Sequence, residues 1–367
     1  MRGNLICVRN FAVEEKITQR KETKIKDTIY NHYIAIDWSI ENMAIARMTK
    51  KANKITVIDV PSDIGEMKVY LKKLKGSKIL VVEETTTSQW LYTELKDYVD
   101  RMVICDPYRN KLLNDGPKTD KIDASKLVRL LKAELIKEVY HSTDKFLYLR
   151  RFVSGYEDLV KAGVRLQNQR YSLLRACGKR GYELAGTKLD SPGDQFAMDC
   201  IDRQIEVYKQ EKEGYEKEFA RLSKDYPEIR HQKSLPGIGP IHAVKIVARV
   251  VTPYRFADKG HYLSYTGLIK LEKISGGRSY GRKNSRYCRQ LKSVYKTSTW
   301  AAIGGNNPIN DYYEYLIQEK RYPEHNARHK ACRKLAILSL GVFKSAKKYQ
   351  PYRRGHVKGY QEIKPGL

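Results

Sequence analysis

Hydrophobic and polar residues follow a strand-like pattern from about residue 31 onward. Apolar or alternating runs at residues 32–38, 43–48 and 55–60 are separated by short polar breaks and predict an antiparallel meander. Helical and short apolar segments then alternate to about residue 135, giving the order β-β-β-α-β-α-β-α. Because a carboxylate ends the first strand of this order, we expect an α/β domain of the RNase H-like fold at residues 31–140.

The segment at residues 143–225 has almost no Pro or Gly except between Gly178 and Gly193. Its charged, helical pattern predicts two long helices, at residues 146–180 and 192–223, which would form a helical hairpin within residues 141–230. Long helices of this kind more often mediate contacts between chains than carry active sites. We therefore expect the hairpin to support a homo-oligomer.

Residues 231–350 are expected to form a mostly α C-terminal domain that opens with a helix-hairpin-helix-like motif. Gly237 and Gly239 lie in a Leu-Pro-Gly-Ile-Gly turn before an Ala-rich helix, where they would let the backbone approach a phosphate. An ordinary tight connection between two helices is the alternative. A helix is expected at residues 258–265, then a Gly-, Ser- and basic-rich loop at residues 267–285, then further helices to about residue 349.

The composition adds a partner to this picture. The 367 residues carry a formal net charge of +28, and residues 260–367 hold 22 Lys or Arg against 6 Asp or Glu. Such a field attracts a polyanion, most commonly nucleic acid. The 27 tyrosines supply rings that stack on bases, although codon bias would also explain them. Residues 1–30 and 351–367 are expected to be a basic arm and a basic tail.

Six cysteines are scattered along the chain without a C-x-x-C pair. This spacing argues against a zinc knuckle or a disulfide framework and fits the reducing cytoplasm. No apolar run approaches the 18 residues of a membrane span, and no signal peptide opens the sequence. We therefore expect a cytoplasmic protein without a membrane partner.

Four acidic residues carry the candidate chemistry. Asp37 and Glu83 each end an apolar strand, and Asp120 and Asp123 are three residues apart at the start of a helix. The first strand of an RNase H-like sheet is central, so Asp37 would be nearly buried and would need a cation to offset its charge. Together the four carboxylates suit Mg²⁺, and two such ions would clamp the oxygens of a phosphoryl transfer.

Alternatives to these assignments remain open. Each acid alone could simply cap a strand or a helix. Glu84 could replace Glu83, although it would point to the opposite face if the strand continues. Asp59 and Asp106 also end predicted strands.

These motifs together resemble one family: the DEDD transposases of prokaryotic insertion sequences that carry a C-terminal serine nucleophile, the bridge-RNA-guided serine recombinases. The resemblance covers roughly residues 31–350. It rests on the three acidic motifs, the Gly-Ile-Gly turn with Arg255-Phe and residues 265–268, the Ile-Ser-Gly-Gly segment at 274–277, and Tyr312-Tyr and residues 333–335 near the end.

The resemblance implies insertion-sequence transposition by DNA strand cleavage and exchange. Ser275 would attack DNA and form a phosphoserine linkage while the four acids bind Mg²⁺. It also implies a guide RNA, donor and target DNA, and a tetramer in which different protomers supply the two catalytic parts. Ser279 and Ser285 share the segment, and a turn serine without chemistry is the plain alternative.

Basic residues near Ser275 and along the last helices are expected to neutralise phosphates. The candidates for nucleic-acid contact are Gly237, Gly239, Arg278, Arg282, Lys283, Arg286, Arg289, Arg333 and Lys334. More broadly, Lys and Arg at residues 270–296 and 320–358 are expected to bind phosphates.

Three other functions are considered. A Holliday-junction-resolvase-like endonuclease would use the same four acids with a water nucleophile and would not need Ser275. A tyrosine recombinase would use His325, Arg328 and Tyr349 but would leave the acids unexplained. A non-catalytic nucleic-acid scaffold would keep its activity without Asp37.

Overall fold

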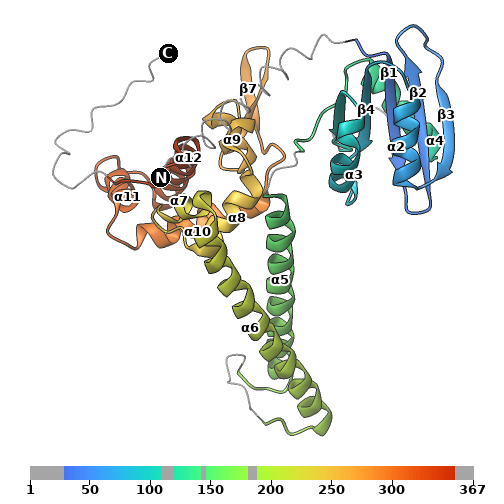
Figure 1. Ribbon diagram of the computed structural model, residues 1–367. Coiled ribbons are helices and arrows are strands. Elements are labelled where there is room, and N and C mark those ends of the chain that lie inside the picture. Colours follow the sequence, from blue (N-terminus) through green and yellow to red (C-terminus); the bar gives the residue numbers. More distant parts are fainter. Residues whose placement is uncertain (1–28, 109–118, 142–145, 181–187, 352–367) are drawn as a thin grey trace, which may run out of the picture. The chain divides into compact units, whose positions relative to one another are not determined.

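The computed structural model describes residues 29–108, 119–141, 146–180 and 188–351. The chain divides into two compact units, Met1–Thr143 and Asp144–Leu367, which are described separately (Figure 1). Most of the expected basic arm and basic tail lies outside the described residues. Within the described part, every helix is too short or too polar to span a bilayer.

The first unit is built on one mixed five-stranded sheet with the strand order β3-β2-β1-β4-β5. Central strand β1 pairs antiparallel with β2 and parallel with β4, and β4 pairs parallel with β5. The expected meander and the RNase H-like order are confirmed. The strands are β1 His32–Trp38, β2 Asn42–Thr49, β3 Thr56–Pro61, β4 Lys78–Glu83 and β5 Arg101–Cys105.

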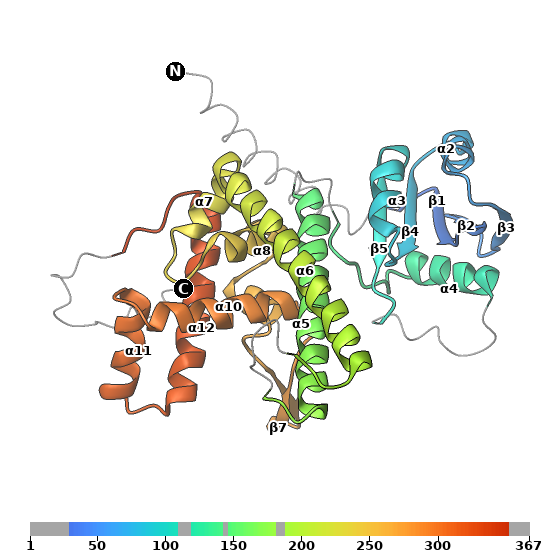
Figure 2. The same cartoon turned by 90° about the horizontal axis from the view of Figure 1, so that it is seen from below.

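Helices cover both faces of this sheet (Figure 2). Helices α2 (Ile64–Lys73) and α3 (Ser88–Leu95), the latter extended by a 3₁₀ turn at Lys96–Tyr98, pack on the face that carries Ile34 and Ile36. Helix α4 (Asp120–Lys132) packs on the other face. Because strand side chains alternate between faces, the odd-numbered positions of β1 point toward α4.

Two neighbouring polar residues, Ser62 and Asp63, precede helix α2, and only the second caps it. The N-cap is Asp63, whose Oδ1 accepts a hydrogen bond of 2.8 Å from the Glu66 backbone N–H. The Ser62 hydroxyl instead donates to the Ser39 carbonyl at 2.9 Å. Asp and Ser are about equally good caps, so the two neighbouring residues could not be separated by residue type alone.

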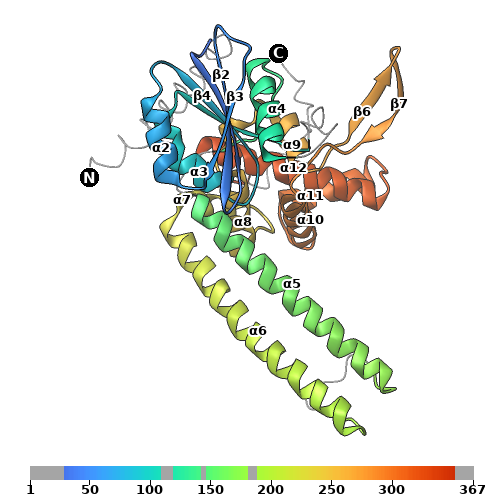
Figure 3. The ribbon, with the colours of Figure 1, turned by 90° about the vertical axis from the view of Figure 1, so that its right-hand side faces the viewer.

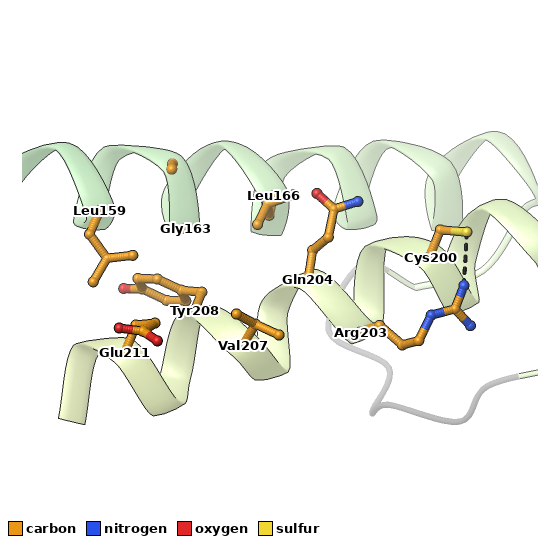
Figure 4. A pocket seen from close by; sticks show the side chains of 10 residues that line it. Leu159, Gly163, Leu166, Cys200, Arg203, Gln204, Val207, Tyr208 and Glu211 are labelled. Atoms are coloured by element: carbon orange, nitrogen blue, oxygen red, sulfur yellow. Dashed lines mark hydrogen bonds between the residues drawn. The ribbon is translucent and has the colours of Figure 1, made fainter. Parts of the chain in front are cut away.

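The second unit contains the expected helical hairpin, formed by α5 (Leu147–Ala176) and α6 (Pro192–Asp225) (Figure 3). At their midpoint the Tyr208 ring lies against α5 where Gly163 leaves room, since a Cβ at Gly163 would lie 2.3 Å from that ring (Figure 4). Near the base of the hairpin, aromatic rings from both helices pack together, with Phe152 and Phe219 at a centroid distance of 5.2 Å.

Short helices complete this unit and pack around a buried chain of hydrogen bonds. The Tyr295 hydroxyl contacts the Tyr262 hydroxyl and lies 2.7 Å from the Ser339 hydroxyl, which donates to Gln232 at 2.6 Å. All four side chains are fully buried, so this series of hydrogen bonds links four helices through satisfied polar groups. The helices are α7 Pro227–Lys233, α8 Pro240–Val250, α9 Lys259–Tyr265, α10 Arg289–Ile303, α11 Pro308–Gln318 and α12 Glu324–Ser345, with a 3₁₀ turn at Pro253–Arg255.

The prediction of a loop at residues 267–285 is wrong. This segment contains a β-hairpin formed by β6 (Leu271–Ser275) and β7 (Arg278–Lys283). The two strands are joined by Gly276 and Gly277, whose φ angles are +56° and +76°. Two consecutive glycines with positive φ are typical of a tight two-residue hairpin turn. Every residue of both strands is exposed, and the hairpin projects from the helices of its unit (Figure 3).

Candidate functional site: a carboxylate cluster on the sheet

Asp37 lies near the end of central strand β1, on the face covered by α4. Tyr33 and Ala35 of the same strand belong to the apolar core beneath α4, and alternation places Asp37 on their side. Its partner across β2 is Ala44, a fully buried residue of that core. Asp37 therefore shares the α4 face of the sheet with Tyr33 and Ala35.

Glu83 ends the parallel neighbour β4, one position beyond the paired residues Ile36 and Val82. Val81 belongs to the core under α4, so Glu83, two residues later, faces α4 as well. Glu84 follows the strand, and its backbone N–H donates to the Cys105 carbonyl at 2.9 Å. This geometry favours Glu83 over Glu84 as the neighbour of Asp37.

The first turn of α4 carries the other two acids. Thr119 is the N-cap, and its hydroxyl accepts a hydrogen bond of 3.3 Å from the Ile122 N–H. Asp120 and Asp123 therefore sit where the positive end of the helix dipole favours negative charge. Asp123 also lies 3.9 Å from the Lys126 ammonium. Side chains from the same helix, including Leu127, pack into the core and fix this end of the helix over the sheet.

The four carboxylates act on one another electrostatically. The pKa of Asp37 is raised to about 6, first by burial and then by the negative charges of Asp120, Glu83 and Asp123. Among the described residues, no hydrogen-bond donor or cation is paired with the Asp37 carboxylate. The structure therefore brings the other three acids within electrostatic range of Asp37, and none of the described residues compensates the charge of its carboxylate.

A metal-binding role for the four acids stays a prediction. Within the described part of the chain, no three His, Cys, Asp or Glu side chains are close enough to hold an ion together. Mg²⁺ is usually bound through one or two carboxylates while it keeps waters and substrate phosphates. Asp37 and Glu83, on adjacent strands, are the residues best placed to hold such an ion, with Asp120 and Asp123 facing them from α4.

An ion pair that the sequence reasoning missed anchors the first turn of α4. Lys121 lies 3.4 Å from Asp59, which pairs with Ala44 in the sheet and so shares the face of Asp37. The Asp59 carboxylate is thus paired with the Lys121 ammonium. The other strand-end acid, Asp106, is buried and accepts a hydrogen bond of 3.0 Å from the Tyr108 N–H. Both acids have structural partners of their own.

Ser275 belongs to the second unit, as the last residue of β6. It pairs with Arg278 across the Gly276-Gly277 turn and is exposed. Of the other serines in the segment, Ser285 is engaged structurally, because its hydroxyl lies 2.7 Å from that of Ser264. Ser279 is exposed on β7.

The basic candidates differ in exposure and in their contacts. Arg278, Arg282 and Lys283 are exposed on β7, where Arg282 lies 3.3 Å from Glu272. Arg333 donates to the Leu268 carbonyl at 3.1 Å and so holds α12 against the end of α9. Arg286 and Arg289 lie beside and at the start of α10, and the Lys334 ammonium lies 6.0 Å from the centroid of the Tyr312 ring.

Gly237 and Gly239 occupy different environments. Gly237 has φ +73°, and a Cβ there would lie 2.0 Å from the Ser298 carbonyl oxygen of α10. Close packing against another helix is therefore sufficient reason for this glycine. Gly239 is the N-cap of α8 and has open space beside it. A phosphate role stays a prediction for both and is sterically simpler at Gly239.

The tyrosine-recombinase arrangement is not formed in the second unit. His325 and Arg328 lie near the start of α12, whereas Tyr349 follows its end and donates its N–H to Ser234 at 2.7 Å. A helix of 22 residues spans roughly 33 Å. These three side chains cannot surround one phosphate within a single chain.

Two family models match the chain. A transposase model, DEDD_Tnp_IS110, matches residues 34–178, which include all four acids. The model of the transposase IS116/IS110/IS902 family matches residues 230–314, which include Ser275. The chain is also similar to the insertion element IS116 uncharacterized 44.8 kDa protein of Streptomyces clavuligerus, at 32% identity over 82 residues; these are 22% of this chain and 21% of that relative's length. Two successive parts of the chain, residues 34–178 and 230–314, thus match models of insertion-sequence transposases of the IS110/IS116/IS902 type in this order.

Proposed function

We propose that this protein catalyses DNA strand cleavage and exchange during transposition of an insertion sequence. The observation that carries the proposal is that Asp120, Glu83 and Asp123 lie near enough to Asp37 for their negative charges to add to the effect of burial in raising its pKa. Grouped carboxylates of this kind suit divalent-metal phosphoryl transfer. When bound, Mg²⁺, in one or two copies, would supply the charge that stabilises the reacting phosphate.

In this proposal Ser275 is the nucleophile. Its oxygen forms a bond to phosphorus as the bond from phosphorus to a deoxyribose oxygen breaks; the serine proton is given up and the leaving oxygen takes up a proton. The exposed position of Ser275 at the tip of a projecting hairpin supports access to DNA, and the neighbouring Arg278 offers a charge for the phosphate. The resemblance further supports a guide RNA, donor and target DNA as partners.

The covalent step is tested by incubating the protein with donor and target DNA, guide RNA and Mg²⁺, and looking for a protein–DNA adduct on a denaturing gel. We expect the adduct with wild type and with Ser279→Ala, and its loss with Ser275→Ala. Asp37→Ala should abolish cleavage while nucleic-acid binding stays near normal. Cleavage without any adduct, at a wild-type rate in Ser275→Ala, would instead support a resolvase-like reaction with a water nucleophile.

Self-association through the α5–α6 hairpin is part of the same proposal, as a dimer or tetramer. Phe196 and Val207 on α6 are 68% and 58% exposed, and Val164 on α5 is also exposed. Apolar side chains at such positions support contact with another chain. Val207→Glu should lower the molar mass measured by light scattering, whereas Lys209→Glu, an exposed charge reversal nearby, should not.

A further inference from the structure

A small cavity of about 200 Å³ lies between α10 and α12 in the second unit. Lys296 and Trp300 of α10 line one side, His325, Arg328 and His329 of α12 line the other, and buried Cys332 lies at its base. This volume is below the roughly 300–1,000 Å³ of pockets for drug-sized ligands. The cavity is therefore suited to a single ring system or a phosphate rather than to a large cofactor.

An exposed tryptophan forms one wall of this cavity. The Trp300 side chain is 58% exposed although it is large and apolar. The Arg328 guanidinium lies 4.4 Å from the centroid of its ring, and Glu324 holds that guanidinium at 3.3 Å. One face of the indole is thus backed by a fixed cation, while the rest stays open to a second flat group.

The surroundings of Trp300 are strongly cationic. Helix α10 contains no acidic residue, and Arg289, Lys292, Lys296 and Trp300 follow one another at i, i+3, i+7 and i+11, on one face of the helix. In the part of the chain that the structure describes, Lys296 forms no ion pair. Partial burial, and then the nearby cations beginning with Lys296, hold the pKa of His329 below its usual range. The rim therefore favours an anionic ligand.

We propose that this pocket binds one unpaired nucleotide, with its base stacked on Trp300 and its phosphates beside Lys296 and Lys292. The inference rests on the proposed function, because it assumes that nucleic acid is the partner. It adds that this pocket binds a single unpaired nucleotide of that nucleic acid. The base must be unpaired because both faces of a base in a duplex are already stacked. A protein partner that inserts a cationic side chain is disfavoured by the basic rim.

The test measures binding of the full-length protein in EDTA by fluorescence anisotropy. The probes are a labelled oligothymidylate, an oligouridylate of equal length and an abasic DNA strand of equal charge. The variants are Trp300→Ala and Trp300→Phe, with Tyr171→Ala as the matched control, because Tyr171 on α5 is also an exposed aromatic residue with a guanidinium, that of Arg175, over its ring. Circular dichroism melting of each variant checks the fold.

Trp300→Ala should weaken binding of the base-bearing strands roughly 5- to 150-fold, which corresponds to the loss of about 1–3 kcal/mol for one stacked base. Binding of the abasic strand should stay unchanged, Trp300→Phe should keep most of the affinity, and Tyr171→Ala should behave as wild type. The tighter of the two base-bearing probes identifies DNA or RNA as the source of the nucleotide.

Equal affinity of Trp300→Ala and wild type for the base-bearing strands would overturn the proposal, as would an equal loss on the abasic strand. The assay needs neither metal nor cleavage, so failure of the roles of Asp37 and Ser275 would leave its outcome untouched. If wild type bound none of the probes, both the pocket and the proposed function would fall.

Discussion

The raised pKa of Asp37 predicts that this carboxylate destabilises the metal-free protein at neutral pH. Its ordinary value is 3.8, and in the folded state it is about 6. The folded state therefore binds the proton more tightly than the unfolded state, so stability falls as pH rises from about 4 to 6 and then levels off. Asp37→Asn removes the ionisable group and should remove this fall.

The rise of about two units in the pKa of Asp37 corresponds to a loss of about 3 kcal/mol in the free energy of unfolding if the group is fully shielded from solvent. Asp37 is only partly buried, so solvent screening reduces the expected effect to about 1–2 kcal/mol. Asp37→Asn should thus match wild type near pH 4 and exceed its stability by that amount at pH 7. Saturating Mg²⁺ should stabilise wild type more than the variant, because an ion bound only by the folded state shifts the equilibrium.

The assay is urea unfolding in EDTA at several pH values, followed by tryptophan fluorescence. A Trp300→Phe background makes the signal report on the first unit alone, where Trp38 and Trp90 pack edge to face at 5.5 Å. The control is Asp97→Asn, since the Asp97 side chain is 75% exposed and its removal should change stability little. A gain from Asp37→Asn that is the same at every pH, or a loss at pH 7, would refute the reasoning.

Three further predictions concern other parts of the molecule. Glu157→Gln should lower the free energy of unfolding, measured by chemical denaturation, by about 2–4 kcal/mol. The reason is that Lys245 and Arg249, both poorly exposed, lose the carboxylate that lies 3.6 and 3.0 Å from them. An effect near zero would show that these ion pairs do not hold α5 to α8. Gly237→Ala should lower the melting temperature by several degrees while Gly239→Ala barely changes it, and equal effects would contradict the packing described for the turn. Glu83→Gln should abolish metal-dependent cleavage on a DNA gel and Glu84→Gln should retain it; the reverse result would exchange their assignments.

Much of the first unit could be predicted because its signals are local. The alternation of residues along β1 predicts which face of the sheet Asp37 lies on. Glu83 ends its strand two residues after Val81, so alternation places it on the same face as Val81. The helical period likewise predicted both arms of the α5–α6 hairpin. These features depend on residues close together in sequence, which is where pattern reasoning is strongest.

Other features depend on distant contacts or on competing local signals. From the sequence we expect a loop in place of the β6–β7 hairpin because Gly, Ser and basic residues are typical of loops, although the Gly276-Gly277 pair is also a signal for a two-residue hairpin turn. Gly237 faces a carbonyl of α10 about sixty positions away, and no local pattern shows that contact. The pairing of Lys121 with Asp59 and of Trp300 with Arg328 likewise needs the packed structure.

Binding of a divalent ion at the carboxylate cluster tests the central claim most directly. Mn²⁺, a spectroscopic substitute for Mg²⁺, would be titrated into the full-length protein and its free fraction followed by electron paramagnetic resonance. Wild type should bind the ion, Asp37→Asn and Glu83→Gln should each weaken binding at least tenfold, and Asp97→Asn should not. Unchanged Mn²⁺ affinity in Asp37→Asn would contradict a metal-binding role for these acids.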